Sequence, residues 1–267
     1  MATTESSGTA RLRQQAINLV VERDGFARVS DLSDDLGVSV VTIRSDLDRL
    51  EAAGRVVRVR GGAVPRSGGQ REVPFEIARD QAGPAKAQLA ARAADLVESG
   101  DTILVDVGTT TTEIARELVL RHELRDIVVF TNSLTIALAL EQAADRIQIV
   151  VTGGTLRPMQ HSLVEPLATT LLEGLHAHIA FIGCNGVHPD AGVTNVNLPE
   201  ASVKRAMLAA ARRRVIVADG SKLGEIELAR VCGLDEVHLL VTDGNADAQS
   251  VDELRQTGLE VLVAGED

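Results

Sequence analysis

Beyond residue 85 the chain alternates between two kinds of apolar pattern, and this alternation most restricts the folds that it can adopt. Runs of about five β-branched and aliphatic residues are separated by longer stretches with the 3.6-residue period of an amphipathic helix. The expected strands are Thr102–Asp106, Ile127–Thr131, Gln148–Thr152, Ile179–Gly183, Val215–Asp219, Val237–Thr242 and Glu260–Val263. The expected helices are Lys86–Glu98, Thr111–Arg121, Ser133–Ala144, Leu167–Leu175, Glu200–Arg213 and Ser250–Gln256. Such an order favours an α/β fold with a doubly wound, mostly parallel sheet.

The N-terminal segment follows another pattern. Apolar residues between Leu12 and Leu50 recur with helical spacing in three short stretches. The second stretch covers Val29–Leu36, where Ser30 is the expected N-cap and Gly37 suits the helix end; Ser39 can cap the third. This spacing predicts a helix-turn-helix.

A wing is expected directly after the third helix. The run Arg55–Arg60 mixes basic and apolar residues and is followed by Gly61-Gly62, which is typical of a two-stranded hairpin. Next comes a segment rich in Pro, Gly and Ser, which is typical of a linker. We therefore expect a disordered leader (1–9), a winged helix-turn-helix domain (10–66), a linker (67–84) and a large α/β domain (85–267).

Charge is divided unevenly between these parts. The whole chain has a net charge of −11, but the segment 10–66 holds ten arginines against eight acidic residues, a net of +2. The segment 67–267 holds 17 basic and 29 acidic residues, a net of −12. A basic head can approach a phosphate backbone while an acidic body stays away from it.

Composition excludes several other classes of protein. The chain has no Trp and no Tyr, so base stacking on aromatic platforms is not expected. It has no apolar run long enough to cross a bilayer and no signal-peptide pattern, which predicts a cytoplasmic protein without membrane contact. Two cysteines and the isolated pair His176 and His178 predict neither a disulfide framework nor a metal site, and no cofactor is expected.

The predicted third helix presents a polar face that suits the major groove of double-stranded DNA. With Ile43, Leu47 and Leu50 facing inward, arginine and hydroxyl side chains remain outside to bind bases and phosphates. The expected DNA-binding residues, with those of the second helix and the wing, are Ser30, Ser39, Val41, Thr42, Arg44, Ser45, Arg49, Arg58 and Arg60.

Loops that suit a phosphate ester follow three of the expected strands. Asp106-Val-Gly108 leads into a threonine-rich helix start, where free amides and the helix dipole favour an anion. The loop contains neither a Walker sequence nor GxGxxG, which favours a small phosphate ester over ATP or NAD. Such loops converge at the carboxyl edge of a parallel sheet. The expected effector-binding residues are Asp106, Gly108, Thr109, Thr110, Thr111, Thr131, Asn132, Ser133, Gly153, Gly154 and Lys222.

Each of these patterns also has a plainer interpretation. The polar helix face suits a generic three-helix bundle, each loop alone suits an ordinary strand-to-helix connection, and Lys222 alone suits a surface lysine. Glu200 and Lys204 lie one helical turn apart, and their plainer interpretation is a solvated pair on a helix surface.

The motifs together resemble the DeoR family of transcriptional regulators. Ser39-Val-Val-Thr42-Ile-Arg44-Ser-Asp46-Leu47 resembles the family's helix-turn-helix signature, and Arg58-Val-Arg-Gly61-Gly62-Ala63 resembles its wing. In the body the matching pieces are Asp106-Val-Gly108-Thr109-Thr110, Thr131-Asn132-Ser133, Gly153-Gly154, Ser162-Leu-Val and Ala218-Asp219 with Ser221-Lys222. The chain departs from the family at Ser45, Arg60 and Glu165, where the family usually has Arg, often His, and usually Gly.

This resemblance implies a fold and a function. The body is expected to be similar to ribose-5-phosphate isomerase, to bind a phosphorylated sugar and to lack catalytic activity. The whole protein is expected to be a sequence-specific regulator of carbohydrate genes, a repressor relieved by its ligand. A homodimer or homotetramer is expected, because two-fold operators match two-fold proteins.

An enzyme is the alternative. A sugar-phosphate isomerase with an accessory DNA-binding head would need a general base over the sugar carbons. Asp106, Glu165 and Glu200 are the only carboxylates that suit this role, and none lies in an acid/base motif.

Overall fold

A computed structural model describes residues 3–24, 26–59, 61–65, 72–80 and 83–266, apart from the side chains of 3–9, 22–24, 65 and 80. The chain forms two compact units, Met1–Ile77 and Ala78–Asp267, which we call the head and the sensor unit. Each unit has a hydrophobic core within itself.

The head is a winged helix-turn-helix. Its helices are α1 (Thr3–Asp24), α2 (Val29–Leu36) and α3 (Val40–Ala52), and its strands are β1 (Ala27–Arg28), β2 (Val56–Val59) and β3 (Gly62–Pro65). In the described part of the head the strands form one antiparallel sheet in the order β1-β3-β2. The wing predicted from the arginine-rich run is confirmed, and β1 is a third strand that the sequence pattern did not predict.

Local chemistry explains the helix-turn-helix. Gly37 ends α2 in the left-handed conformation (φ 62°), which glycine adopts without steric cost. Ser39 caps α3 by accepting a hydrogen bond from the Thr42 amide (3.2 Å). Ile43 and Leu47 are completely buried in the head core, as their spacing predicted. Ser30, the expected N-cap of α2, instead lies inside that helix, which begins at Val29.

The sensor unit is built on a parallel sheet, as predicted. Within the described residues this sheet has seven strands in the order β15-β14-β12-β9-β4-β5-β6, and every neighbouring pair is parallel. Its strands are β4 (Thr102–Val105), β5 (Ile127–Thr131), β6 (Ile147–Val151), β9 (Ala177–Gly183), β12 (Ala211–Val217), β14 (Leu239–Asp243) and β15 (Val261–Ala264). The chain runs from β4 to β6 in one direction and from β9 to β15 in the other. The direction therefore reverses between β4 and β9.

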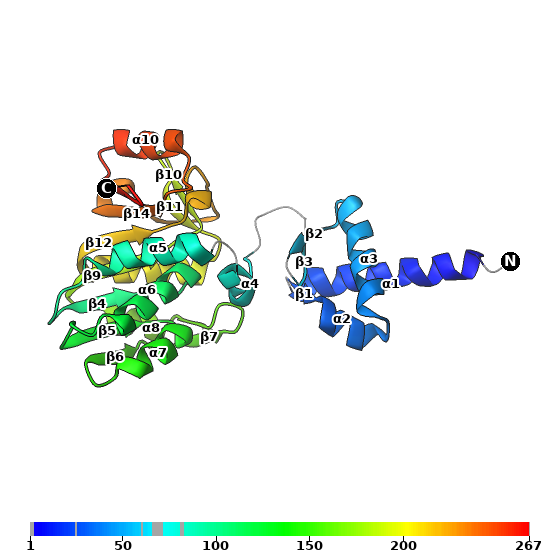
Figure 1. Cartoon of the computed structure of the whole chain (residues 1–267), viewed down its shortest axis with the longest axis horizontal. Helices are drawn as coiled ribbons and strands as arrows, with labels where there is room; N and C mark the ends of the chain where they lie inside the picture. Colours follow the sequence, from blue (N-terminus) through cyan, green and yellow to red (C-terminus); the bar gives the residue numbers. More distant parts are fainter. Residues whose placement is uncertain (1–2, 25, 60, 66–71, 81–82, 267) are drawn as a thin grey trace. The chain divides into compact units, whose positions relative to one another are not determined.

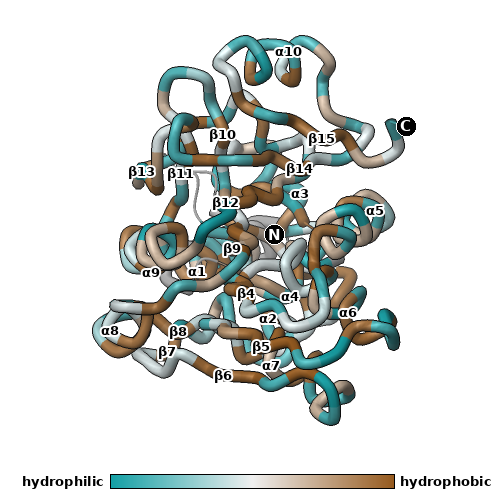
Figure 2. Tube along the Cα trace, turned by 90° about the vertical axis from the view of Figure 1, so that its left-hand side faces the viewer, coloured by the Kyte–Doolittle hydropathy of each residue, from teal (hydrophilic) through white to brown (hydrophobic). Residues whose placement is uncertain are grey.

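Helices cover both faces of this sheet. The helices α5 (Gly83–Ala94), α6 (Thr109–Leu120) and α7 (Leu134–Leu140) pack on one face. The helices α8 (Leu167–Leu172) and α9 (Leu198–Ala209) pack on the other, where α10 (Ala248–Gln256) also contributes to the core. Figures 1 and 2 show the strands between these layers, and brown, hydrophobic residues are frequent along the strands of the main sheet in Figure 2.

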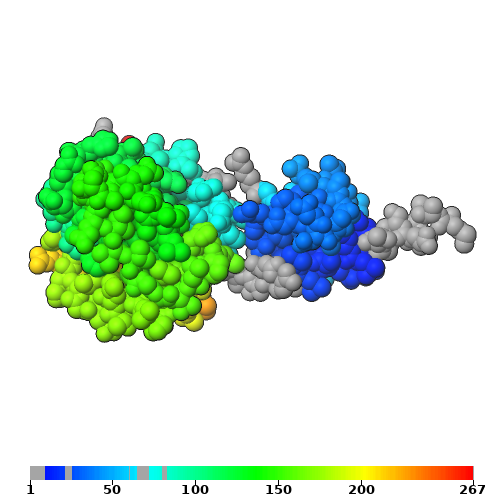
Figure 3. All heavy atoms as spheres, turned by 90° about the horizontal axis from the view of Figure 1, so that it is seen from below, coloured from blue at the N-terminus to red at the C-terminus, as the bar shows by residue number. Residues whose placement is uncertain are grey.

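Two small antiparallel sheets accompany the main sheet in the described sensor unit. One pairs β7 (Thr155–Arg157) with β8 (Ser162–Val164), and the other joins β10 (Gly186–His188), β11 (Gly192–Asn195) and β13 (Ala229–Cys232). Figure 3 views the unit from the side of its β6 edge. Neither of the two small antiparallel sheets was predicted, because strands of three or four residues are too short to show the two-residue period of a β-strand.

Several predicted boundaries were wrong. The helix expected over Glu200–Arg213 ends at Ala209, and the strand expected from Val215 already begins at Ala211. The segment 67–84, expected to be a linker, contains α4 (Phe75–Asp80) and the start of α5. The segment 1–9, expected to be disordered, contains the first residues of α1, which begins at Thr3.

Candidate nucleic-acid interface and effector site

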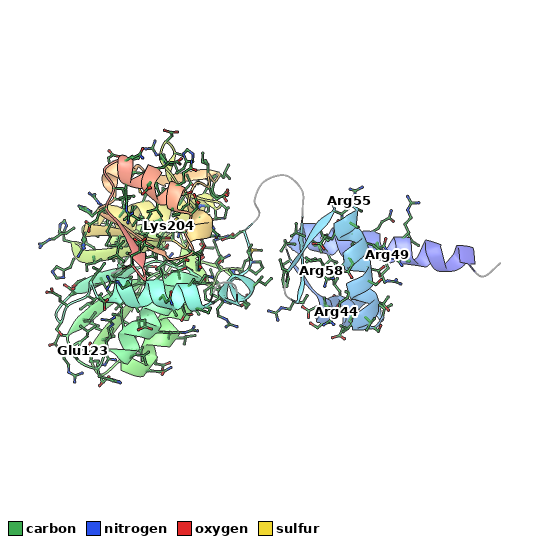
Figure 4. All side chains as sticks on the ribbon, turned by 45° about the horizontal axis from the view of Figure 1, so that its top comes forward. Arg44, Arg49, Arg55, Arg58, Glu123 and Lys204 are labelled. Atoms are coloured by element: carbon green, nitrogen blue, oxygen red, sulfur yellow. The ribbon has the colours of Figure 1, made fainter. Side chains whose placement is uncertain are left out.

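The outer face of α3 carries the residues that the sequence predicted for DNA. Arg44, Ser45 and Arg49 are exposed, and Val41 has 74% of its surface exposed. Figure 4 shows Arg44 and Arg49 on α3, Arg55 in the turn after this helix, and Arg58 on β2. Because the inner face of α3 fills the core, this outer face is available to a groove.

Arg58 has a second role that the sequence did not reveal. Its guanidinium Nη1 donates to the Arg44 carbonyl (3.1 Å) and lies 3.1 Å from the Asp48 carboxylate. Its backbone amide donates to Glu51 (2.7 Å). These bonds join the wing to α3, so Arg58 positions the wing as well as adding positive charge. Arg60, also expected to bind DNA, lies outside the described residues.

A buried ion pair holds α3 against α1. Asp46 is 2% exposed and accepts hydrogen bonds from Arg13 (2.5 Å) and Gln14 (2.8 Å). Asp46 belongs to the motif quoted from the sequence, but only the packing shows that it faces inward. A buried carboxylate with two donors orients the recognition helix.

The candidate effector site lies at the carboxyl edge of the main sheet, around the reversal between β4 and β9. In open α/β sheets this is where ligands bind, because the loops diverge there and leave a crevice. The loops after β4, β5 and β6 are neighbours at this edge, since the three strands are paired in that order. The order of the strands therefore agrees with the predicted convergence of the three loops.

The first turn of α6 forms the first loop. Gly108 has φ 157°, and a Cβ there would lie 3.0 Å from the Thr111 hydroxyl oxygen. Thr112 makes the first helical bond, to the Gly108 carbonyl (3.0 Å), so the amides of Thr109, Thr110 and Thr111 have no carbonyl within the helix. The hydroxyls of Thr111 and Thr112 donate back to the Gly108 carbonyl. Thr111 is completely buried, so of the three residues with a free amide only Thr109 and Thr110 retain exposed surface.

The loops after β5 and β6 are held by buried polar groups. Asn132 is completely buried, and its side chain accepts from the Val107 amide (2.9 Å), which ties the second loop to the first. Ser133 caps α7 by accepting from the Ile136 amide. Gly154 has φ 123°, and a Cβ there would lie 2.1 Å from the Val164 carbonyl oxygen, so only glycine fits. These residues determine the shape of the carboxyl edge. The sequence predicted the loops but not the contacts that hold them.

Lys204 and Asp106 form a buried ion pair at the reversal point. The Lys204 ammonium donates to Asp106 Oδ2 and to the Gly183 carbonyl (3.0 Å), which joins the ends of β4 and β9. Figure 4 shows Lys204 inside the sensor unit. Burial raises the pKa of Asp106 to about 6, although Lys204 opposes this shift. Burial alone would lower the pKa of Lys204, but Asp106 and Glu200 raise it above its ordinary value.

Glu200 continues this network one helical turn away. Its carboxylate accepts from Arg157 on β7 and from the Ser162 hydroxyl on β8 (2.6 Å). Glu200 and Lys204 are 5% and 2% exposed, so the plainer interpretation of a solvated surface pair does not hold. Val203 and Met207, three residues beyond each of them, are also buried. This spacing is the signal that could have placed the pair on the inner face of α9.

Lys222 lies near the same edge, in a half-buried turn (Gly220–Lys222) after β12. Burial raises the pKa of Cys184 to about 12, and Lys204 and Lys222 partly oppose this shift. Lys222 is therefore within electrostatic reach of the residues that follow β9. The predicted residues thus lie in loops that follow strands of the main sheet, while Arg157 and Lys204 are charged residues near them that the prediction left out.

A winged helix-turn-helix with an exposed basic recognition helix, followed by a parallel sheet with polar loops at its carboxyl edge, defines a class of DNA-binding transcriptional regulators. The family model of the DeoR-like helix-turn-helix domain matches residues 13–67, and that of the DeoR C-terminal sensor domain matches residues 82–244. The chain therefore belongs to the DeoR family of transcriptional regulators.

Two relatives, GlpR and the putative aga repressor, agree with this assignment. The chain is 36% identical to the HTH-type transcriptional regulator GlpR of Haloferax volcanii, over 95% of this chain and 97% of that protein. It is 33% identical to the putative aga operon transcriptional repressor of Escherichia coli O157:H7, over the full length of both. Among solved structures, ribose 5-phosphate isomerase A of Methanocaldococcus jannaschii is similar with a TM-score of 0.39 and 21% identity, covering 51% of this chain and 52% of that one.

No helix in the described ranges is both long enough and apolar enough to cross a bilayer.

Proposed function

We propose that this regulator is a repressor of carbohydrate genes, and that a phosphorylated sugar bound at the carboxyl edge of the sensor sheet releases it from its operator. It acts in the cytoplasm as a homodimer or homotetramer on a two-fold operator. Membership in the DeoR family supports this proposal, as does the relative named as a repressor of an aga operon.

One observation carries the choice of effector. The first turn of α6 contains three backbone amides without partners in the helix, of which that of Thr111 is in a completely buried residue. This turn follows Asp106, whose Oδ1 is buried and has no hydrogen-bond partner among the described residues. The amides suit a phosphate group. An unpaired buried carboxylate oxygen is costly and suits a hydroxyl donor, which a sugar supplies. The two features together match a sugar phosphate.

A thermal-shift screen tests the proposal. Ligand that binds only the folded state stabilises it by about 2.7 kcal/mol at a hundredfold excess over Kd. We expect a rise in the melting temperature of the sensor unit with at least one member of a panel of pentose, hexose and amino-sugar monophosphates, and none with the unphosphorylated sugars. A panel without any response would contradict the proposed effector.

Substitutions at the edge should separate ligand response from DNA binding. We expect Thr110→Val and Lys222→Ala to weaken the response to the active sugar phosphate about tenfold, because each removes a polar group worth roughly 1–2 kcal/mol toward an anion. DNA binding without ligand should stay as in the wild type. Arg205→Ala, which removes an exposed cation hydrogen-bonded to Arg230 and Ser202, serves as the control. Wild-type response in both edge variants would place the site elsewhere.

The isomerase alternative has one observation in its favour. The pKa of Asp106 is raised to about 6, a value that suits general acid–base chemistry near neutral pH. Asp106 is nevertheless held by Lys204, and the family consists of regulators. We expect no turnover in a coupled isomerase assay with aldose phosphates. Robust turnover that Asp106→Asn abolishes would establish the enzyme instead.

A further inference from the structure

The chain enters the sensor unit at the same edge of the sheet as the proposed effector site. The helix α5 precedes β4 directly, and such a helix packs antiparallel to the strands, so its first turn lies at their carboxyl ends. Lys86 in this turn is within electrostatic reach of Asp219, which follows β12, and of Glu113 in α6. The segment that connects the head to the sensor therefore arrives beside the ligand edge.

Lys86 touches this connecting segment. Its ammonium donates to the Ala78 carbonyl (2.5 Å) in α4. The helix α4, Phe75–Asp80, spans the boundary between the two units, which falls between Ile77 and Ala78. A displacement of Lys86 thus acts directly on the part of the chain that leads to the head.

The surroundings of Lys86 make its position sensitive to an added anion. The residue is 5% exposed, and its burial lowers its pKa. Asp219 and Glu113 raise this pKa while Lys222 lowers it further, so the charges at the edge include both signs. One additional negative charge nearby would substantially change the electrostatic forces on the buried Lys86 ammonium, because solvent and salt screen charges only weakly in the interior.

We propose that Lys86 couples the effector site to the head: an anion bound at the first turn of α6 draws the Lys86 ammonium away from the Ala78 carbonyl and loosens α4. This inference rests on the proposed function, since it takes the phosphorylated effector as the anion. A coupling of ordinary size would change operator affinity about 5- to 150-fold. Lys86 is then a positioning residue, whose removal uncouples the two units without removing either binding activity.

The test uses the full-length protein and compares Lys86→Met with Arg92→Met. Methionine keeps the length of the buried stem, and Arg92 is an exposed cation on the same helix, paired with Asp95. We expect both variants to bind the active sugar monophosphate in the thermal-shift screen and to bind operator DNA without it. The ligand should weaken operator binding in the wild type and in Arg92→Met, and less than twofold in Lys86→Met. Lys86→Arg, which keeps a charge and a donor, should retain part of the response.

A second measurement does not depend on identifying the sugar. Hydrogen–deuterium exchange of residues 75–80 should be faster in Lys86→Met than in the wild type. Inorganic phosphate at millimolar concentration should accelerate this exchange in the wild type and have no further effect in the variant.

The outcomes separate the two proposals. A full ligand response in Lys86→Met, or exchange in α4 that Lys86→Met leaves unchanged, would overturn the coupling. Loss of sugar-phosphate binding itself in Lys86→Met would make Lys86 a ligand of the effector and would also overturn it. If no sugar phosphate of the panel binds the wild type, the proposed function is wrong. The hydrogen–deuterium exchange of α4 then tests the role of Lys86 independently.

Discussion

Replacing Lys204 with methionine is expected to lower the free energy of unfolding of the sensor unit by about 3–5 kcal/mol at pH 7. Lys204 is the cation that pairs with Asp106, and both side chains are buried between the ends of β4 and β9. Without the ammonium, a carboxylate with no exposed surface remains in the interior. Denaturant unfolding of the wild type and the variant measures the loss.

The pH dependence of this loss identifies its cause. The pKa of Asp106 is about 6 in the folded protein against 3.8 ordinarily, so the folded state binds a proton that the unfolded chain has released. The stability contributed by this group is therefore present below about pH 4 and is lost as the pH rises through about 6. Methionine at 204 removes the positive charge that opposes the shift, and we expect the variant to regain stability between pH 7 and pH 5.

A double variant is the matched control. Asp106→Asn with Lys204→Met leaves no buried charge at this point, and replacing both members of a buried pair often costs little. We expect the double variant to recover most of the stability lost in Lys204→Met. If it unfolds as readily as the single variant, packing around Lys204 rather than its charge is responsible.

Arg44→Ala is expected to weaken operator binding by about 1–3 kcal/mol, roughly five- to 150-fold. Arg44 is exposed on the outer face of α3, and its carbonyl rather than its side chain holds Arg58. The substitution should therefore leave the melting temperature of the protein unchanged. Gel-shift titration on a duplex selected by the protein from a random pool measures the effect.

A charge-matched control separates contact from general attraction. Arg116→Ala removes an exposed arginine of the sensor unit that pairs with Glu113, and changes the net charge equally. We expect it to leave operator affinity within twofold of the wild type. Equal losses in both variants would mean that net charge, rather than the recognition helix, accounts for the effect of Arg44.

The recognition helix shows which features of the structure a local sequence pattern can predict. Its cap at Ser39 and its inward Ile43 and Leu47 follow from spacing alone and are confirmed. The sequence places Asp46 in a motif and Arg58 in a basic wing. Their bonds to α1 and to the Arg44 carbonyl connect different elements, and no local pattern specifies such partners.

At the effector edge, too, local sequence predicted some features and only the tertiary structure revealed others. The glycine and hydroxyl residues after β4, β5 and β6 stand out in the sequence, because a strand, a turn and a helix start follow each other directly. The charged residues of the edge do not stand out. The plainer interpretation of Glu200 and Lys204 is a pair in solvent, whereas in the fold each binds a different partner that is distant along the chain.

The sequence by itself determined the helix-turn-helix, the wing, the parallel α/β architecture and the place of the glycine- and hydroxyl-rich loops after β4, β5 and β6. Hydrophobic periodicity, helix caps and glycines act over a few residues, so they can be recognised in the sequence alone. The tertiary structure alone decided which charges are buried and what they bind. Asp106 meets Lys204 across 98 positions of the chain, and Lys86 on α5 meets the Ala78 carbonyl on α4. Such pairs form because burial leaves a charge no solvent to bind, and the nearest opposite charge or carbonyl is set by packing.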